Sequence, residues 1–144
     1  MNALELLKED HQKVKKLFTQ AEQDQKQQKS LFNQIKQELE THTFIEETVF
    51  YPAMEKHEEL KDMVLESIEE HRQVKTLLKE MENLASDSEK FEPKLKVLRE
   101  NVEHHAEEEE EGKMFPKVRG ILDEGALAKL GEQLQAAKSK RKAA

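Results

Sequence analysis

The amino-acid sequence predicts an all-α fold, an up-down-up-down four-helix bundle with a short C-terminal helix. Its 144 residues are enough for about one domain with a buried core. Charged residues make up 38% and hydrophobic residues 35%, with only four glycines and three prolines, which is typical of long amphipathic helices. Apolar residues recur at three- and four-residue spacing in four successive segments separated by short polar stretches. Four such helices with short connections favour the bundle.

The first helix is predicted over residues 2–28, where apolar side chains from Leu4 to Ala21 recur at the spacing of one helix face. The second helix is predicted to begin at Ser30, because a serine hydroxyl can accept a hydrogen bond from the free N–H groups of a first helical turn. Pro52 is expected to end or kink this helix, since proline lacks the N–H that would continue the backbone ladder.

The third helix is predicted to begin near Glu59 and to end before the turn-like stretch 85–88, which consists of small and polar residues. Pro93 suits the first turn of a fourth helix, where a missing N–H leaves no backbone hydrogen bond unmade. Gly112 and Pro116 are expected to disturb the end of that helix.

A short amphipathic helix is expected after Gly120, packed over one end of the bundle. Its apolar face consists of three leucines, Leu127, Leu130 and Leu134. A basic cluster near its end is expected to keep that end soluble and comprises Lys138, Lys140, Arg141 and Lys142. The chain therefore divides into a four-helix bundle, residues 1–120, and a C-terminal amphipathic helix with a basic tail, residues 121–144.

Charge and composition argue against several classes of partner and cofactor. The net charge of -7 disfavours nucleic acid, because a protein that binds phosphate backbones needs a basic face. The chain has no cysteine, so disulfides and thiolate metal sites are excluded. The N-terminus is already charged and no apolar run reaches membrane-spanning length. We therefore expect a cytoplasmic protein without a membrane partner, either a monomer or a weak homodimer.

The two halves of the predicted bundle resemble each other at an offset of about 60 residues. The segment DHQKVKKLF at residue 10 matches EHRQVKTLL at residue 70, and HTFIEETVFYP at residue 42 matches HHAEEEEEGKMFP at residue 104. A near-twofold internal symmetry would bring the matching positions of both halves around one point.

Each of the four apolar stripes is interrupted by one histidine, at His11, His42, His71 and His105. A core histidine is costly unless it has a partner. Counting residues to the connecting turns, at a rise of about 1.5 Å per residue, places the four rings at similar heights, so we expect them to converge. Glu46 follows His42 by four residues and Glu109 follows His105 by four, so each carboxylate shares a helix face with its histidine.

Four imidazoles and two carboxylates suit two borderline-hard metal ions such as iron. The nitrogens can bind terminally, while each carboxylate can bridge the pair and offset cationic charge. An oxo or hydroxo group could join the two ions, and manganese and zinc are alternatives to iron, since His and Glu do not select iron by themselves. Such a pair keeps open positions for a small gaseous or peroxide ligand.

The pattern His11, His42-x-x-x-Glu46, His71 and His105-x-x-x-Glu109, with the endings VFYP and MFP, resembles the hemerythrin-like HHE cation-binding domain over roughly residues 1–120. The resemblance implies a non-haem di-iron site bridged by the two glutamates and held terminally by the histidines. Two features depart from the family pattern. Lys75 stands where oxygen-carrying hemerythrins have a further histidine. One extra glutamate in the acidic run makes Glu110 a rival of Glu109, since the family also uses a spacing of five.

Other polar side chains near these residues are interpreted more plainly. Glu47 could replace Glu46 or support it from outside, and helical phase favours Glu46 as the inward residue. Tyr51 could donate a hydrogen bond near the site, but a plain interfacial tyrosine is favoured. His57 and His104 lie off the predicted stripes and are expected on the surface.

The sequence therefore predicts a non-haem di-iron protein that binds dioxygen or a related small oxidant, for carriage, sensing or scavenging. The chemistry would belong to the metal, and the bundle would supply ligands, dryness and access. The alternatives are a di-iron enzyme acting on peroxide or nitric oxide and a protein of iron storage or homeostasis.

Overall fold

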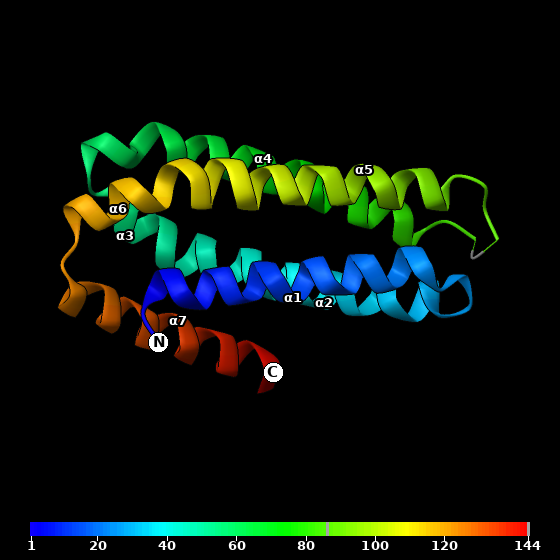
Figure 1. Cartoon of the computed structure of the whole chain (residues 1–144), viewed down its shortest axis with the longest axis horizontal. Coiled ribbons are helices and arrows are strands. Elements are labelled where there is room, and N and C mark those ends of the chain that lie inside the picture. The colour runs from blue at the N-terminus through cyan, green and yellow to red at the C-terminus, as the bar shows by residue number, and fades with distance from the viewer. Residues whose placement is uncertain (86, 144) are drawn as a thin grey trace.

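A computed structural model describes residues 1–85 and 87–143, with only the backbone described for residue 143, and these ranges contain helices but no β-strand (Figure 1). The elements, in chain order, are α1 (Ala3–Gln23), η1 (Gln25–Gln27), α2 (Gln28–Ile45), η2 (Glu46–Phe50), α3 (Tyr51–Glu55), η3 (Glu58–Leu60), α4 (Lys61–Glu82), α5 (Phe91–Glu103), η4 (His104–Met114), α6 (Phe115–Ile121) and α7 (Glu124–Ala143). The predicted all-α fold is confirmed. Ser86, within the predicted turn, lies outside the described residues, as does Ala144.

Four long helical rods form the bundle (Figure 1). The first is α1 and the third is α4. The second joins α2, the π-helical segment η2 and α3 end to end, and the fourth joins α5, the π-helical segment η4 and α6. α1 packs against α2, and α4 packs against α5, so the bundle consists of two helical hairpins. The predicted four-helix bundle is therefore confirmed.

The start of α1 follows from local hydrogen bonding. The Asn2 side chain accepts a hydrogen bond from the Glu5 backbone N–H at 2.9 Å, and the Glu5 carboxylate accepts one from the Asn2 N–H at 2.9 Å. The second helix does not begin at Ser30 as predicted. α2 begins at Gln28, because the short 3₁₀ turn η1, capped by the Asp24 side chain, leads directly into it.

The predicted breaks at Pro52, Gly112 and Pro116 do not end their rods. In both rods a π-helical segment comes just before the proline, so that the N–H of Tyr51 bonds to the carbonyl five residues back, at Glu46, and the N–H of Phe115 bonds to Glu110 in the same way. The prolines then fall within the first two positions of α3 and α6, where a helix does not need their N–H.

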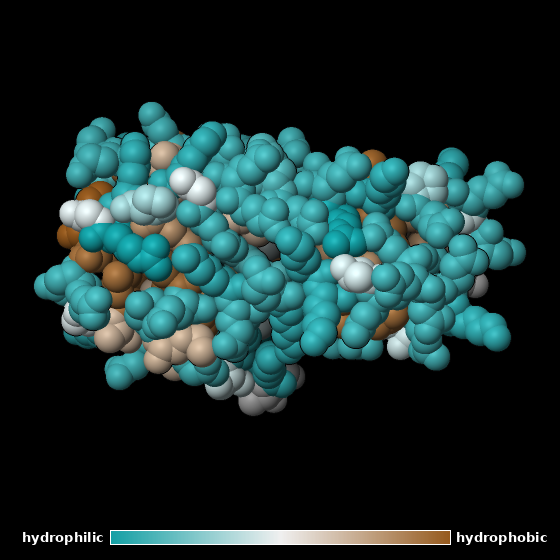
Figure 2. All heavy atoms as spheres, in the orientation of Figure 1, coloured by the Kyte–Doolittle hydropathy of each residue, from teal (hydrophilic) through white to brown (hydrophobic). Residues whose placement is uncertain are grey.

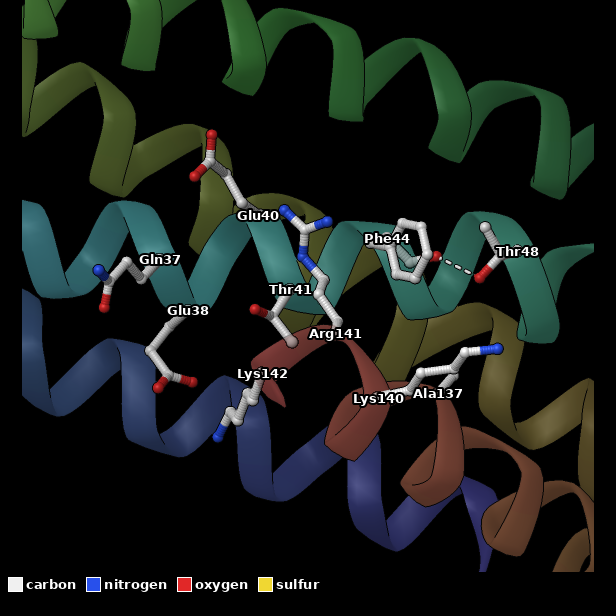
Figure 3. Close-up of a pocket in the computed structure, with 10 residues that line it drawn as sticks. All are labelled: Gln37, Glu38, Glu40, Thr41, Phe44, Thr48, Ala137, Lys140, Arg141 and Lys142. Atoms are coloured by element: carbon white, nitrogen blue, oxygen red, sulfur yellow. Dashed lines mark hydrogen bonds between the residues drawn. The ribbon is translucent and has the colours of Figure 1, made fainter. Parts of the chain in front are cut away.

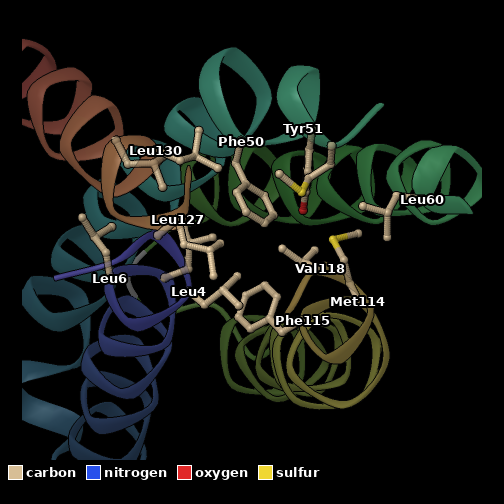
Figure 4. Packing of buried hydrophobic residues seen from close by; sticks show 14 of the residues in the cluster. Leu4, Leu6, Phe50, Tyr51, Leu60, Met114, Phe115, Val118, Leu127 and Leu130 are labelled. Carbon is tan, nitrogen blue, oxygen red and sulfur yellow. The ribbon is translucent and has the colours of Figure 1, made fainter. Parts of the chain in front are cut away.

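Two clusters of buried apolar side chains fill the bundle. One lies toward the connections α1–α2 and α4–α5 and includes Phe18, Phe32 and Leu78. The other lies at the opposite end, where Leu4, Phe50, Phe115 and Leu127 come from α1, η2, α6 and α7 (Figure 4). Histidines of the four rods lie in the sequence between residues of one cluster and residues of the other, so a layer of polar side chains separates the two.

α7 runs back along the first hairpin, beside α1 and α2, and its leucines join the apolar cluster at one end of the bundle (Figure 1). Its three leucines are buried as expected. A Cβ on Gly131 would lie 2.4 Å from the Met1 carbonyl oxygen, so glycine is needed for this close approach. Hydrophilic residues cover most of the face shown in Figure 2, and apolar atoms gather where α6 leads into α7. Among the described residues, no helix combines the length and apolarity needed to cross a membrane.

Candidate metal centre

Six buried polar side chains meet in the layer between the two apolar clusters. This central cluster consists of His11, His42, Glu46, His71, His105 and Glu110. Each of the four rods contributes one histidine, and the second and fourth rods each add one glutamate from a π-helical segment. Both glutamates are 0% exposed. Such burial of polar groups is costly unless they have partners, so the layer requires a specific explanation.

One half of the cluster is formed by the first hairpin. The Nε2 atom of His11 lies 3.1 Å from Glu110 Oε1, and the Nε2 atom of His42 lies 3.2 Å from Glu46 Oε1. Two ligand atoms that each lie about 2.1 Å from one metal ion are roughly 3 Å apart. The spacing of these four side chains therefore fits one bound cation.

The second half is formed by the second hairpin and uses the same two glutamates. The Nε2 atom of His71 lies 3.0 Å from Glu46 Oε1, and that of His105 lies 3.3 Å from Glu110 Oε2. The two Nε2 atoms are 3.2 Å apart. In each half, the possible ligand atoms of two histidines and both glutamates lie within 4.8 Å of one another. Each group could therefore hold a metal ion, and the two groups have Glu46 and Glu110 in common.

Every histidine of the cluster turns its other ring nitrogen, Nδ1, toward a carboxylate. These supporting carboxylates are Glu111 at 2.6 Å from His11, Asp10 at 2.9 Å from His42, Glu47 at 2.7 Å from His71 and Glu70 at 2.6 Å from His105. A carboxylate can only accept, so each Nδ1 carries the proton and each Nε2 is free to bind a cation. Histidine ligands of metals are oriented in this manner.

The supporting carboxylates follow the internal symmetry of the chain. Asp10 and Glu70 each precede the first histidine of a half and support the second histidine of that half. Glu47 and Glu111 each follow a shared glutamate and support a histidine of the opposite half. Of these four carboxylates, only Glu47 was predicted from the sequence to have such a role. The repeated Asp/Glu-His and Glu-Glu pairs were the signal that would have identified the others.

Burial disfavours the charged forms of the cluster's side chains, but groups of opposite charge lie close enough to favour them more strongly. Burial alone would lower the pKa of His42, yet Glu46 and Asp10 raise it to about 10. Burial would raise the pKa of Glu46, yet His42 and the hydrogen bonds from other cluster members hold it well below its usual value. Without metal, protons on the imidazoles therefore balance the carboxylates, and a metal ion has to displace those protons.

Two buried atoms of the cluster, His42 Nε2 and Glu46 Oε2, make no hydrogen bond, although His42 Nε2 lies 3.2 Å from the other oxygen of Glu46. Unpaired polar atoms are rare in a protein interior and call for an explanation. Both point into a set of nitrogen and oxygen donors of the kind that bind transition metals, and a cation would satisfy both. The donor set and its unpaired atoms fit bound metal.

Glu110, and not Glu109, faces the cluster, at a spacing of five from His105. Residues 104–114 form a π-helix, whose backbone bonds join residues five apart, so the side chain five residues on returns to the same face. Of the two candidates, Glu109 and Glu110, the preference for Glu109 assumed an α-helical spacing, which this segment does not have. Glu109 lies outside the cluster, where its carboxylate is 3.3 Å from Lys113 Nζ and 3.6 Å from His104 Nε2.

Tyr51 lies inside the cluster rather than at a plain interface. Its hydroxyl donates a hydrogen bond to Glu110 Oε2 and lies 3.2 Å from Glu46 Oε1 and 3.3 Å from His71 Nε2. Burial and the two carboxylates raise the pKa of Tyr51 well above its usual value, so the phenol keeps its proton. Phe115 holds the matching position of the other half, stacked on His11, so the two halves differ chemically.

Other residues singled out in the sequence lie around the cluster. Glu47 holds His71 from outside and is itself bonded by Lys75 at 2.9 and 3.0 Å, so Lys75 stands behind a supporting carboxylate and not at the centre. His104 is exposed and lies 2.6 Å from Glu108. His57 is partly exposed and takes no part in the cluster.

A small cavity of about 30 Å³ opens between the four histidines and the apolar side chains of the neighbouring layer. The apolar part of its wall includes Val14, Leu39, Val74 and Val102. This volume admits a water molecule or a diatomic molecule and nothing much larger. A larger hollow of about 940 Å³ is an open groove between α2 and the end of α7, and none of the cluster lines it (Figure 3).

The fold and the cluster together define a class of protein, a helical bundle with a buried histidine and carboxylate centre able to hold metal ions. The sequence matches the family described as Hemerythrin HHE cation binding domain over residues 2–118. The chain belongs to this family. A crystal structure of a hemerythrin HHE cation binding domain-containing protein from Mycobacterium kansasii is similar, with a TM-score of 0.85 and 27% identity, covering 97% of this chain and 86% of that one.

Two curated relatives are longer than this chain. A protein of Nostoc sp. named DNA nickase is 30% identical over 142 residues, which is 97% of this chain and 40% of the relative. An uncharacterized hemerythrin-like protein of Schizosaccharomyces pombe is 37% identical over 81 residues, which is 55% of this chain and 40% of the relative. The chain therefore spans about 40% of the length of either relative.

Proposed function

We propose that the chain is a non-haem di-iron protein whose metal pair binds dioxygen or a related small oxidant. The observation that carries this proposal is the arrangement of the cluster, in which four Nε2 atoms and two carboxylates lie around two positions for a cation and border a cavity of about 30 Å³. The cation-binding family and the unpaired donor atoms support it further.

In this proposal each ion has two histidines of its own and both shared glutamates. His11 and His42 would hold one ion, and His71 and His105 the other. This mixed set of two nitrogen and two carboxylate donors suits iron, although manganese and zinc accept the same donors. Bound iron supplies open coordination positions and electrons for a small oxidant.

The protein residues contribute position, dryness and size selection. The supporting carboxylates fix each imidazole ring in the orientation that points Nε2 inward. The apolar side chains of the cavity wall would limit the access of water, and electrostatic interactions are stronger where water is scarce. A cavity of about 30 Å³ favours dioxygen, nitric oxide or peroxide over any larger substrate. It leaves no room for an iron mineral, which weighs against storage.

A second candidate function is enzymatic, and Tyr51 is the observation that favours it. Its hydroxyl oxygen lies 3.3 Å from the Nε2 atoms of both His71 and His105, so one half of the cluster has a hydroxyl group that Phe115 does not supply to the other half. Reduction of peroxide consumes protons, and a positioned donor would assist it. Reversible binding of dioxygen does not require that proton to leave Tyr51.

Nucleic acid is not part of the proposed function, although one relative is named DNA nickase. The chain matches 40% of that relative, and its net charge of -7 opposes binding to a phosphate backbone. Incubation of the metal-loaded chain with supercoiled plasmid tests this directly. We expect no conversion to the open circular form.

Metal analysis combined with optical spectroscopy tests the proposal. We expect protein loaded with Fe²⁺ without oxygen to retain two irons per chain and to gain an absorption band on exposure to air. A band that disappears on deoxygenation and returns on reoxygenation supports binding, whereas steady consumption of peroxide or nitric oxide supports the enzyme. Folded protein that takes up no metal from Fe²⁺, Mn²⁺ or Zn²⁺ would exclude both.

A further inference from the structure

The end of α7 carries a lysine that does not behave as part of a solvated tail. Lys138 lies one turn after Leu134, on the face of α7 that packs against the bundle. Its side chain is 14% exposed, whereas Lys140, Arg141 and Lys142 are exposed beside the open groove (Figure 3). The expectation that all four basic residues serve solubility is therefore wrong for Lys138.

Lys138 reaches the central cluster through Asp10. Its ammonium group donates to Asp10 Oδ1, and Asp10 Oδ2 lies 2.9 Å from His42 Nδ1. The opposite nitrogen of that ring, Nε2, is the unpaired atom that faces the cluster. A continuous chain of contacts thus joins α7 to the side of the cluster formed by the first hairpin.

The other supporting carboxylates do not need such a lysine. The side chain of Asp10 is 4% exposed, whereas those of Glu70, Glu111 and Glu47 are 20%, 23% and 28% exposed. Water can solvate the latter three, but a buried carboxylate needs a protein partner of opposite charge. Lys75, which bonds Glu47, is itself 50% exposed. Lys138 therefore stabilises the charge of Asp10, as water does for the other three supporting carboxylates.

We propose that Lys138 is a positioning residue for the metal ion held by His11 and His42, so that docking of α7 and binding of that ion stabilise each other. This inference rests on the proposed di-metal function. Lys138 holds Asp10, Asp10 holds the His42 ring, and the ring presents Nε2 to the ion. Lys138 also lies beyond residues 2–118, the part of the chain matched to the family.

The test compares Lys138→Met, which keeps the unbranched stem and removes the charge, with Lys138→Arg, which keeps the charge, and with Lys140→Met as a control on the exposed face. Titration with Co²⁺ under anaerobic conditions, followed by visible absorption, gives the affinity for each of two ions. Loss of an outer support of a histidine ligand weakens metal binding by about 10- to 100-fold. We expect Lys138→Met to weaken one ion about tenfold, at the lower end of that range, since Lys138 acts through Asp10.

Two further backgrounds assign the effect to one half of the cluster. In His71→Ala, the remaining ion is the one at His11 and His42, and Lys138→Met is expected to weaken it as in the wild type. In His11→Ala, the remaining ion is at the opposite half, and Lys138→Met is expected to change nothing. Hydrogen exchange of α7 amides is expected to slow on Co²⁺ binding in the wild type, and less in Lys138→Met.

The outcomes separate the inference from the function on which it rests. Equal affinities of Lys138→Met and the wild type would overturn the inference. So would an equal weakening by Lys138→Met in the His11→Ala background, or weak binding by a Lys138→Arg variant whose circular dichroism shows full helix content. A wild-type chain that binds fewer than two Co²⁺ ions would contradict the proposed function itself.

Discussion

Replacement of Glu110 by glutamine tests whether the metal ligand follows His105 by five residues, as Glu110 does, or by four, as Glu109 does. Glu110 Oε1 lies 3.1 Å from His11 Nε2 and Oε2 lies 3.3 Å from His105 Nε2, so this residue serves both halves of the cluster. Glu110→Gln keeps the shape of the side chain and removes its charge. In the proposed centre, each ion would then lose one of four charged or imidazole ligands. Glu109→Gln is the matched control, because that carboxylate pairs outside the cluster with Lys113.

The magnitude follows from linkage between metal binding and folding. At a free metal concentration of about 100 times Kd, one bound ion stabilises the fold by about 2.7 kcal/mol. If loss of a direct ligand weakens binding about 100-fold, the same metal concentration gives only about 0.4 kcal/mol. For a chain of this length a kcal/mol corresponds to roughly 4 °C in Tm, so the metal-induced rise in Tm falls by roughly 9 °C for each ion.

Thermal unfolding with and without Zn²⁺, followed by circular dichroism, measures this difference. We expect Glu110→Gln to lose most of the metal-induced rise and Glu109→Gln to keep all of it. A large loss in Glu109→Gln with a normal response in Glu110→Gln would refute the role of the π-helical segment and restore the α-helical spacing.

Three further perturbations are expected to give distinct results. His71→Ala should release one of two irons and keep the fold, and unchanged iron content would count against His71 as a ligand. Tyr51→Phe should retain both irons but destabilise the metal-free protein to urea by about 1–3 kcal/mol, because Glu110 loses a buried donor; equal urea midpoints would oppose this. The pKa of His42 is about 10 in the metal-free fold against 6.5 as its ordinary value. The stabilisation that protonated His42 gives the metal-free fold is therefore complete below about pH 6.5 and is lost as the pH rises through 10. The metal-induced rise in Tm should grow over the same range, because protons then compete less with the metal for the His42 ring. A metal response that weakens with rising pH would contradict the exchange of protons for metal.

The helices and the meeting of the four histidines were predictable because both follow from regular spacing. Apolar stripes specify which face of each helix is buried, and equal distances from the turns place His71 and His105 at one height. The distances of His11 and His42 from the predicted turn are less equal, but these two histidines reach the same layer because the connection through η1 takes up the difference. The family resemblance added the identity of the metal, which remains a proposal.

The parts that could not be predicted depend on local departures from regular spacing and on contacts between distant segments. Because residues 104–114 form a π-helix, Glu110 and not Glu109 faces the cluster, and no residue type in this segment predicts a π-helix. The place of Tyr51 depends on the same backbone irregularity in the second rod. The contact between Lys138 and Asp10 spans 128 residues, so only the docking of α7 reveals it.

The most direct measurement is the number of metal ions retained per chain after anaerobic loading with Fe²⁺ and removal of the excess, made on the wild type and on Glu110→Gln and Glu109→Gln. We predict two irons for the wild type and for Glu109→Gln, and far fewer for Glu110→Gln. Folded wild-type protein without iron, or equal retention by all three proteins, would contradict a shared metal centre at these six side chains.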